Sequence, residues 1–107
     1  MTENEKLNLY KTLEQNKVSK KEETHKIMYL GQHYTDTVYA FGNYKVVDTW
    51  HTNENNETKN FVCVFDGNRP LGGWYEKQPE KSKDIHDIYM AAKNKAEKVK
   101  IPVKQYQ

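Results

Sequence analysis

The side chains best suited to chemistry in this 107-residue chain are four histidines and one cysteine: His25, His33, His51, His86 and Cys63. No histidine pair has the four-residue helical spacing of a zinc site, and no His-Glu-x-x-His run occurs. Two of them, His33 and His51, could share acid–base chemistry if the fold brought them together. Their partner would then be an aspartate, Asp36 or Asp48. Cys63 stands between two valines, a setting typical of a small buried hydrophobe and unfavourable for a nucleophile. We therefore predict no enzyme activity, no cofactor and no metal site.

The glycines do not form a phosphate-binding loop. Gly67 and Gly72 have the required separation, but the Gly-Lys-Ser/Thr ending of such a loop is missing. The remaining glycines stand where turns between strands are expected, so no nucleotide site is predicted.

The segment 65–75 has the most unusual composition in the chain. It contains the only arginine, Arg69, followed closely by the pair Trp74 and Tyr75. Arginine and large aromatic side chains are the types enriched at the energetic centres of protein interfaces. We predict a partner-binding surface made of Arg69, Trp74 and Tyr75, joined by Trp50 from a neighbouring strand. The alternative is an ordinary hairpin turn in which Trp74 enters the core.

Positive charge accumulates at the C-terminal end, although the net charge of the whole chain is only +2. From Ile88 onward there are five lysines and a single glutamate; the lysines are Lys93, Lys95, Lys98, Lys100 and Lys104. Such a basic helix beside a tyrosine-rich sheet could contact phosphates and stack on bases, which makes nucleic acid an alternative partner. The same lysines also suit a solvated helix end, where cations interact favourably with the helix dipole.

The N-terminal third is predicted to contain one helix and one short strand. Thr2 and Glu5 have the spacing of a capping box, and the leucines that follow indicate a helix over 3–16. The polar stretch 16–23 is either a connection or, through Ser19 and Glu22, the start of a second helix. The apolar run 27–30, closed by a glycine, favours a strand.

The centre of the chain is predicted to be an antiparallel meander. Two strands, 37–41 and 44–50, flank the two-residue turn Gly42-Asn43, which is typical of a tight hairpin. An exposed loop over 52–59 leads to 61–65, which is apolar on both faces and is expected to be a central strand. After a turn at 66–70 comes a last strand over 72–76, whose paired glycines indicate a bulge or a close backbone approach.

The C-terminal pattern predicts an amphipathic helix over 82–100. Ser82 is the expected N-cap, and apolar residues recur with helical spacing. Pro102 prevents continuation of the helix into the tail 101–107, of which 103–107 is expected to be frayed. The predicted fold is a single α+β domain, 1–107. It has a helix and polar connection (1–24), an antiparallel sheet of four to five strands (25–77) and a C-terminal helix packed on one face of the sheet (82–100).

Length and composition exclude a second domain and a membrane-spanning segment. The N-terminus has no signal-peptide pattern, so we expect a cytoplasmic protein. Leu, Ile, Val and Phe total 20 residues, few for a folded domain, but thirteen aromatic residues supply additional apolar area. Not all the sheet aromatics fit under two helices, so some should form a binding patch on the outer face.

The predicted function is that of a small non-catalytic protein that binds a macromolecule. Sixteen lysines against one arginine, with many asparagines and tyrosines, are typical of an AT-rich genome. Together with the short length, this favours a phage or mobile-element inhibitor or anti-defence factor that contacts a protein partner. Its oligomeric state, including a homodimer, is left open, and nucleic-acid binding is the alternative.

Overall fold

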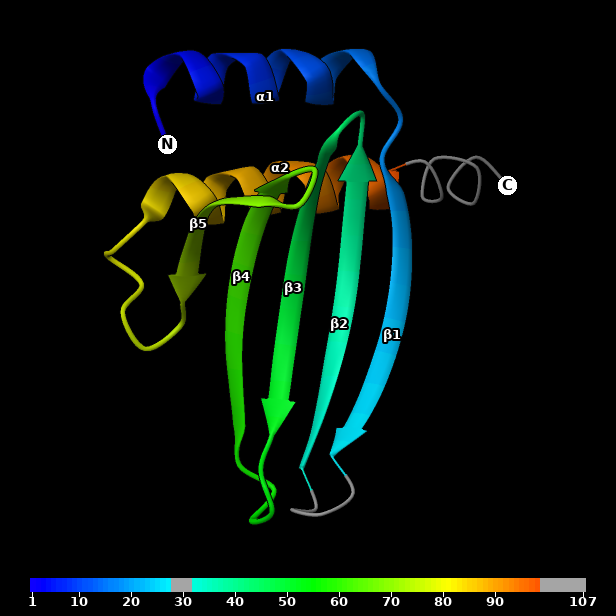
Figure 1. The fold of residues 1–107 in the computed structure, drawn as a ribbon, viewed down its shortest axis with the longest axis vertical. Coiled ribbons are helices and arrows are strands. Elements are labelled where there is room, and N and C mark those ends of the chain that lie inside the picture. Colours follow the sequence, from blue (N-terminus) through cyan, green and yellow to red (C-terminus); the bar gives the residue numbers. More distant parts are fainter. Residues whose placement is uncertain (28–31, 99–107) are drawn as a thin grey trace.

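The computed structural model describes residues 1–27 and 32–98 and contains two helices and one five-stranded sheet (Figure 1). Their order is α1 (Glu3–Gln15), β1 (Ser19–Ile27), β2 (Gln32–Phe41), β3 (Tyr44–Thr52), β4 (Thr58–Asp66), β5 (Arg69–Tyr75) and α2 (Lys83–Lys98). Each strand pairs antiparallel with the next, which gives the sheet order β1-β2-β3-β4-β5. The predicted α+β meander with a helix packed on one face is confirmed.

Helix α1 begins with the predicted capping box. The Glu5 amide donates to Thr2 Oγ1 at 3.1 Å, and the Thr2 amide donates to Glu5 Oε1 at 2.9 Å. These bonds satisfy amides that the first helical turn otherwise leaves unpaired. Leu9 and Leu13 are buried, whereas Leu7 is 65% exposed, so the apolar face of α1 is narrower than the sequence pattern suggested.

Helix α1 lies against the turn between β2 and β3. Gly42 in this turn has a φ of 56°, a left-handed conformation that favours glycine. A Cβ atom at this position would also lie 2.6 Å from Thr12 Cγ2 of α1. The glycine therefore permits both the tight hairpin and the close approach of the helix.

The polar stretch 16–23 contains no second helix: residues 16–18 connect α1 to β1, as one of the two alternatives predicted, but residues 19–23 belong to a strand that was not predicted. Ser19 begins β1, which pairs with β2 along its full length, from Ser19 opposite Ala40 to Ile27 opposite Gln32. This is an edge strand with charged side chains on both faces, so it lacks the apolar alternation by which a strand is recognised. Residues 28–30 of the predicted short strand lie outside the described residues.

Strand β4 is confirmed as an interior strand, and β5 begins earlier than predicted. Pairing shifts between Val64 opposite Gly72 and Phe65 opposite Pro70, so Leu71 is an extra residue. The predicted irregularity is therefore present, immediately before the paired glycines. A Cβ atom on Gly72 would approach Ile85 Cδ1 of α2 to 3.0 Å, so the glycine allows β5 to pack closely against α2.

Helix α2 packs on β2 to β5, as predicted, but its first turn differs from expectation. Ser82 has a φ of 60°, not the extended conformation of an N-cap, and its carbonyl accepts from the amides of Ile85 and His86. The expected continuation of the helix over 99–100 and the tail 101–107 lie outside the described residues.

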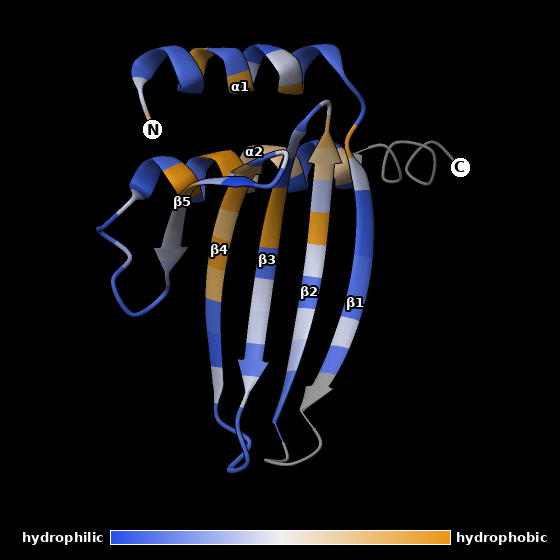
Figure 2. Cartoon of the chain, viewed as in Figure 1, coloured by the Kyte–Doolittle hydropathy of each residue, from blue (hydrophilic) through white to orange (hydrophobic). Residues whose placement is uncertain are grey.

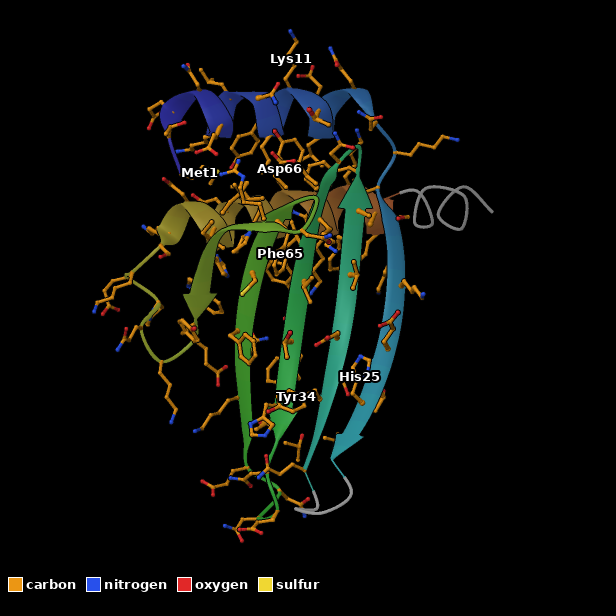
Figure 3. All side chains as sticks on the ribbon, viewed as in Figure 1. Met1, Lys11, His25, Tyr34, Phe65 and Asp66 are labelled. Carbon is orange, nitrogen blue, oxygen red and sulfur yellow. The ribbon has the colours of Figure 1, made fainter. Side chains whose placement is uncertain are left out.

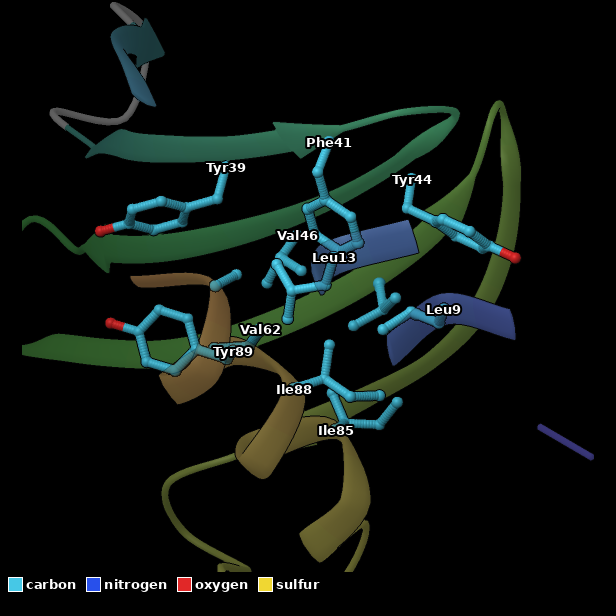
Figure 4. Packing of buried hydrophobic residues seen from close by; sticks show 12 residues of the cluster. Leu9, Leu13, Tyr39, Phe41, Tyr44, Val46, Val62, Ile85, Ile88 and Tyr89 are labelled. Atoms are coloured by element: carbon cyan, nitrogen blue, oxygen red, sulfur yellow. The ribbon is translucent and has the colours of Figure 1, made fainter. Parts of the chain in front are cut away.

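The hydrophobic core occupies one end of one face of the sheet. Leu9 and Leu13 of α1 meet Phe41 of β2 and Ile88 of α2, together with the other buried residues in Figure 4. Figure 2 shows the same asymmetry, because the apolar segments of β2, β3 and β4 gather beside the helices while the far ends of these strands are polar. Strands of nine or ten residues are about 30 Å long, more than a crossing helix about 10 Å wide can cover.

A buried polar cluster marks the boundary of this core. Asp48 of β3 is 7% exposed and accepts two hydrogen bonds, from Asn60 Nδ2 of β4 at 2.6 Å and from the Tyr89 hydroxyl of α2 at 2.8 Å. Burial, followed by the bond to Asp48, raises the pKa of the Tyr89 hydroxyl, which therefore remains a donor. The cluster thus connects two strands to the helix.

Replacing Asp48 with alanine should destabilise the fold by about 2–4 kcal/mol, because the Tyr89 hydroxyl would be left buried without an acceptor. Urea denaturation followed by circular dichroism measures the loss. Tyr89→Phe, which removes only one bond, should cost about 1–3 kcal/mol. Asp66→Ala, at a more exposed aspartate, is the control and should cost less than about 1 kcal/mol. An Asp48→Ala protein as stable as the control would show that the cluster does not stabilise the fold.

Glu5 should make the stability depend on pH. The Thr2 amide and then the Arg69 guanidinium lower the pKa of Glu5 from 4.5 to about 2. A group with a depressed folded-state pKa stabilises the fold fully above its unfolded pKa, and this contribution is lost as the pH falls toward the folded value. The urea midpoint of wild type should therefore exceed that of Glu5→Gln near pH 7, and the difference should shrink below about pH 4. Glu3→Gln in the same turn is the control, and a pH-independent difference at Glu5 would refute the linkage.

Candidate binding groove on the open face of the sheet

The five strands leave one face of the sheet uncovered by either described helix (Figure 1). Side chains alternate between faces along each strand, so the register identifies the residues on this open face. One row crosses all five strands: Glu23, Asp36, Thr49, Phe61 and Tyr75. The row is acidic at the β1 end and aromatic at the β5 end.

A groove of about 470 Å³ lies on this open face. Lys45, Val47 and Thr49 of β3 line its middle, and Phe61, Cys63 and Phe65 line the side formed by β4. His25, Tyr34 and Asp36 line the opposite side, which belongs to β1 and β2. Figure 3 shows the labelled side chains of His25, Tyr34 and Phe65 distributed across these strands. We call this feature the open-face groove.

Aromatic side chains remain on the open face, as the sequence predicted. Phe61 lies 5.9 Å from Tyr75 between ring centroids, and Tyr75 is 58% exposed. Lys45 Nζ lies 5.5 Å from the centre of the Phe65 ring. Other sheet aromatics, including Tyr39, are in the core, and Tyr29 lies outside the described residues.

The acidic end of the groove contains an incompletely paired carboxylate. Among the described residues, Asp36 Oδ1 is the one buried side-chain oxygen or nitrogen without a hydrogen-bond partner. The other oxygen, Oδ2, lies 3.9 Å from His25 Nε2, which is too far for a hydrogen bond. His25 Nε2 is nearer to Glu23, at 3.5 Å, and Glu23 in turn pairs with Lys21 at 3.0 Å.

The predicted partner-binding residues do not share one surface. Arg69 is held by Glu5 of α1 at 2.9 Å and also contacts Asp66 at 3.5 Å. Trp74 points to the helix side, where its ring is 4.7 Å from that of His86 and its Nε1 donates to the Pro79 carbonyl at 3.4 Å.

Tyr75 is the one member of the predicted set on the open face. Trp50, which is 42% exposed, lies on the helix-facing side of β3, beyond the buried Asp48. Strand alternation therefore separates Tyr75 from both tryptophans.

The lysines proposed as phosphate contacts are partly engaged within the fold. Lys95 Nζ donates to the carbonyls of Leu13 and Glu14 and so caps the C-terminal end of α1. Lys93 Nζ lies 5.8 Å from the centre of the Tyr89 ring. The side chain of Lys98, and all of Lys100 and Lys104, lie outside what the structure describes.

The histidines do not form the conditional acid–base pair. His33 and His51 lie on opposite faces of the sheet, and Asp48 is bonded to Asn60 and Tyr89 on the helix side. His51 Nε2 instead makes a 2.9 Å hydrogen bond with Gln32 Oε1. In residues 1–27 and 32–98, no three His, Cys, Asp or Glu side chains are grouped to hold a metal ion.

No pattern in the sequence indicated that His25, Tyr34 and Asp36 line one site. Only the register brings His25 opposite Tyr34 and Asp36 opposite Thr49. A signal for the groove was nevertheless present, because the run Phe61 to Phe65 is apolar at odd and even positions alike. The even positions fill the core, and the odd positions line the groove.

Cys63 in the groove should react slowly with thiol reagents. Burial raises the pKa of the Cys63 thiol, so less of it is thiolate near neutral pH. With iodoacetamide at about pH 8, the native protein should react at least about threefold more slowly than the same protein in urea. Mass spectrometry measures both rates, and equal rates would contradict the half-buried position.

None of the described helices is long and apolar enough to span a membrane. Comparisons with protein-family models, curated proteins and solved structures found no match to this chain. The open-face groove combines aromatic rings, a carboxylate and a lysine on one face of the sheet.

Proposed function

We propose that this protein is a non-catalytic binding protein that holds an extended segment of a protein partner in the open-face groove. The observation that carries this proposal is an aromatic and aliphatic groove on a sheet face that no described helix covers. Apolar side chains of a partner can pack in this groove beside the rings of Phe61 and Phe65. Burying this apolar surface would favour association through the hydrophobic effect.

The groove suits a segment of a macromolecule. It is open to solvent and crosses several strands, so it does not enclose a ligand as a small-molecule cavity does. Phe61 and Tyr75 present rigid rings, the kind of side chain that contributes most to protein interfaces. An extended chain can place alternate side chains against these rings and leave the others in solvent.

Nucleic acid is less well supported as the ligand of this groove. Lys45 is the one lysine among its lining residues, and Asp36 contributes negative charge. Lys21 and Lys59 lie on the same face outside the lining, and Lys21 pairs with Glu23. Phosphate binding depends on an excess of positive charge. The C-terminal lysines remain an alternative site for nucleic acid, but Lys95 already serves as a cap.

Peptides selected from a random displayed library against the wild-type protein should be rich in aromatic and aliphatic residues. Phe61→Ala should weaken their binding at least about tenfold, because it removes a ring from the groove. Leu7→Ala is the matched control, since Leu7 is 65% exposed on α1, and it should leave binding unchanged. Bound peptide should also slow the alkylation of Cys63, which lines the groove.

The proposal fails if the selected peptides bind Phe61→Ala as tightly as wild type or leave Cys63 unprotected. It also fails if a single-stranded oligonucleotide, and no peptide, protects Cys63. Light scattering tests whether a second copy of this chain occupies the groove. If the protein is a homodimer that dissociates when Phe61 is replaced, this face is a self-association surface. Circular dichroism establishes that each variant is folded.

A further inference from the structure

We propose that the open-face groove selects a partner segment with a basic side chain, lysine or arginine, close to an aromatic one. The cation would lie against Asp36, and the ring would lie against Phe61. This inference rests on the proposed function of the groove and specifies the chemistry of the segment that it holds.

The missing hydrogen-bond partner of Asp36 Oδ1 supports a cationic ligand. This oxygen is buried without a donor, and the nearby His25 nitrogen is beyond hydrogen-bond distance from Oδ2. A carboxylate that has lost water without gaining donors is under-solvated, so a charge-assisted hydrogen bond from a ligand compensates it well. The side chain remains 25% exposed and lines the groove, and rotation of its broad χ2 torsion can present either oxygen.

The surrounding charges also favour a cation. Glu23 adds a second carboxylate on the same face, and Lys21, at 3.0 Å, neutralises Glu23 and not Asp36. His25 lies between the two carboxylates and is 56% exposed at its side chain. Lys45 lies on the same face of β3 as Thr49, the residue opposite Asp36, but four residues earlier in the strand. Its Nζ lies over the Phe65 ring. Lys59 of β4 lies opposite His51 on this face. Among the described residues, neither Lys45, Lys59 nor any other lysine or arginine forms an ion pair with Asp36, so a ligand cation can take that place.

The spacing of the row sets the pattern of the ligand. Asp36 on β2 and Phe61 on β4 are separated by two strand intervals, about 10 Å. In an extended segment, side chains two residues apart point the same way and start about 7 Å apart. The separation of Asp36 and Phe61 is larger than this, and the length of a lysine or arginine side chain covers the difference. The predicted pattern is thus a basic residue and an aromatic residue with one residue between them.

The closing experiment uses three acetylated and amidated peptides. The first is Thr-Lys-Thr-Phe-Thr, and the other two have norleucine or glutamate in place of lysine. Titration of isotope-labelled protein, followed by the amide signals of Thr49 and Phe61, gives each dissociation constant. The lysine peptide should bind about tenfold more tightly than the norleucine peptide, because only lysine can pair with Asp36.

Asp36→Asn should remove this tenfold advantage, so that the lysine and norleucine peptides bind with similar dissociation constants. The matched control is Asp66→Asn, an aspartate on the opposite face whose side chain is 38% exposed, and it should change neither affinity. Added salt should weaken the binding of the lysine peptide and leave the binding of the norleucine peptide unchanged. If Asp36→Asn does not fold, the comparison of the three peptides on wild type decides alone.

The titrations distinguish failure of the basic-residue preference from failure of the proposed docking function. If the norleucine peptide binds as tightly as the lysine peptide, or the glutamate peptide binds most tightly, the basic-residue preference is overturned while the groove keeps its function. If none of the peptides shifts Thr49 or Phe61, both the preference and the proposed docking function are overturned.

Discussion

The shortage of apolar surface on the two helices is the constraint on which the rest of the structure depends. Leu9 and Leu13 are the buried residues of α1, and α2 contributes one apolar stripe. Together they cover one end of one face of the sheet, up to the buried Asp48. The hydrogen bonds of Asp48 to Asn60 and Tyr89 close the core where its apolar side chains end. Everything beyond that boundary, and the whole opposite face, must be stable in contact with water or with a partner.

This constraint explains why the open face combines polar and aromatic residues. Its edge at β1 carries Lys21, Glu23 and His25, which protect an edge strand from unwanted pairing. Its centre and far side carry Thr49, Phe61 and other groove residues, which are less exposed. A groove with a carboxylate on one side and rings on the other follows from this gradient.

Long-range polar contacts attach α1 to the rest of the fold. Arg69 pairs with Glu5, and Lys95 caps the carbonyl end of the helix. Both residues looked like candidates for partner binding because their types are common at interfaces and phosphate sites. Their partners are distant in sequence, so composition alone could not distinguish an internal contact from an external one. The one arginine of this chain thus makes a contact with α1 that is visible only in three dimensions.

Local patterns in the sequence determined the class of fold and most of its elements. The capping box at Thr2, the Gly42-Asn43 turn and the apolar repeat of α2 depend on interactions between near neighbours, and all three correspond to observed elements. The number of aromatic residues in the predicted sheet also indicated that some rings would remain on an outer face. Strand β1 was missed because an edge strand needs no apolar face, and its structure depends on backbone pairing with β2. Only the tertiary structure decided which side chains share a surface. Register and strand alternation bring Asp36 into one row with Phe61 and place Trp74 on the other face, because neighbours across a sheet are set by pairing and not by sequence distance.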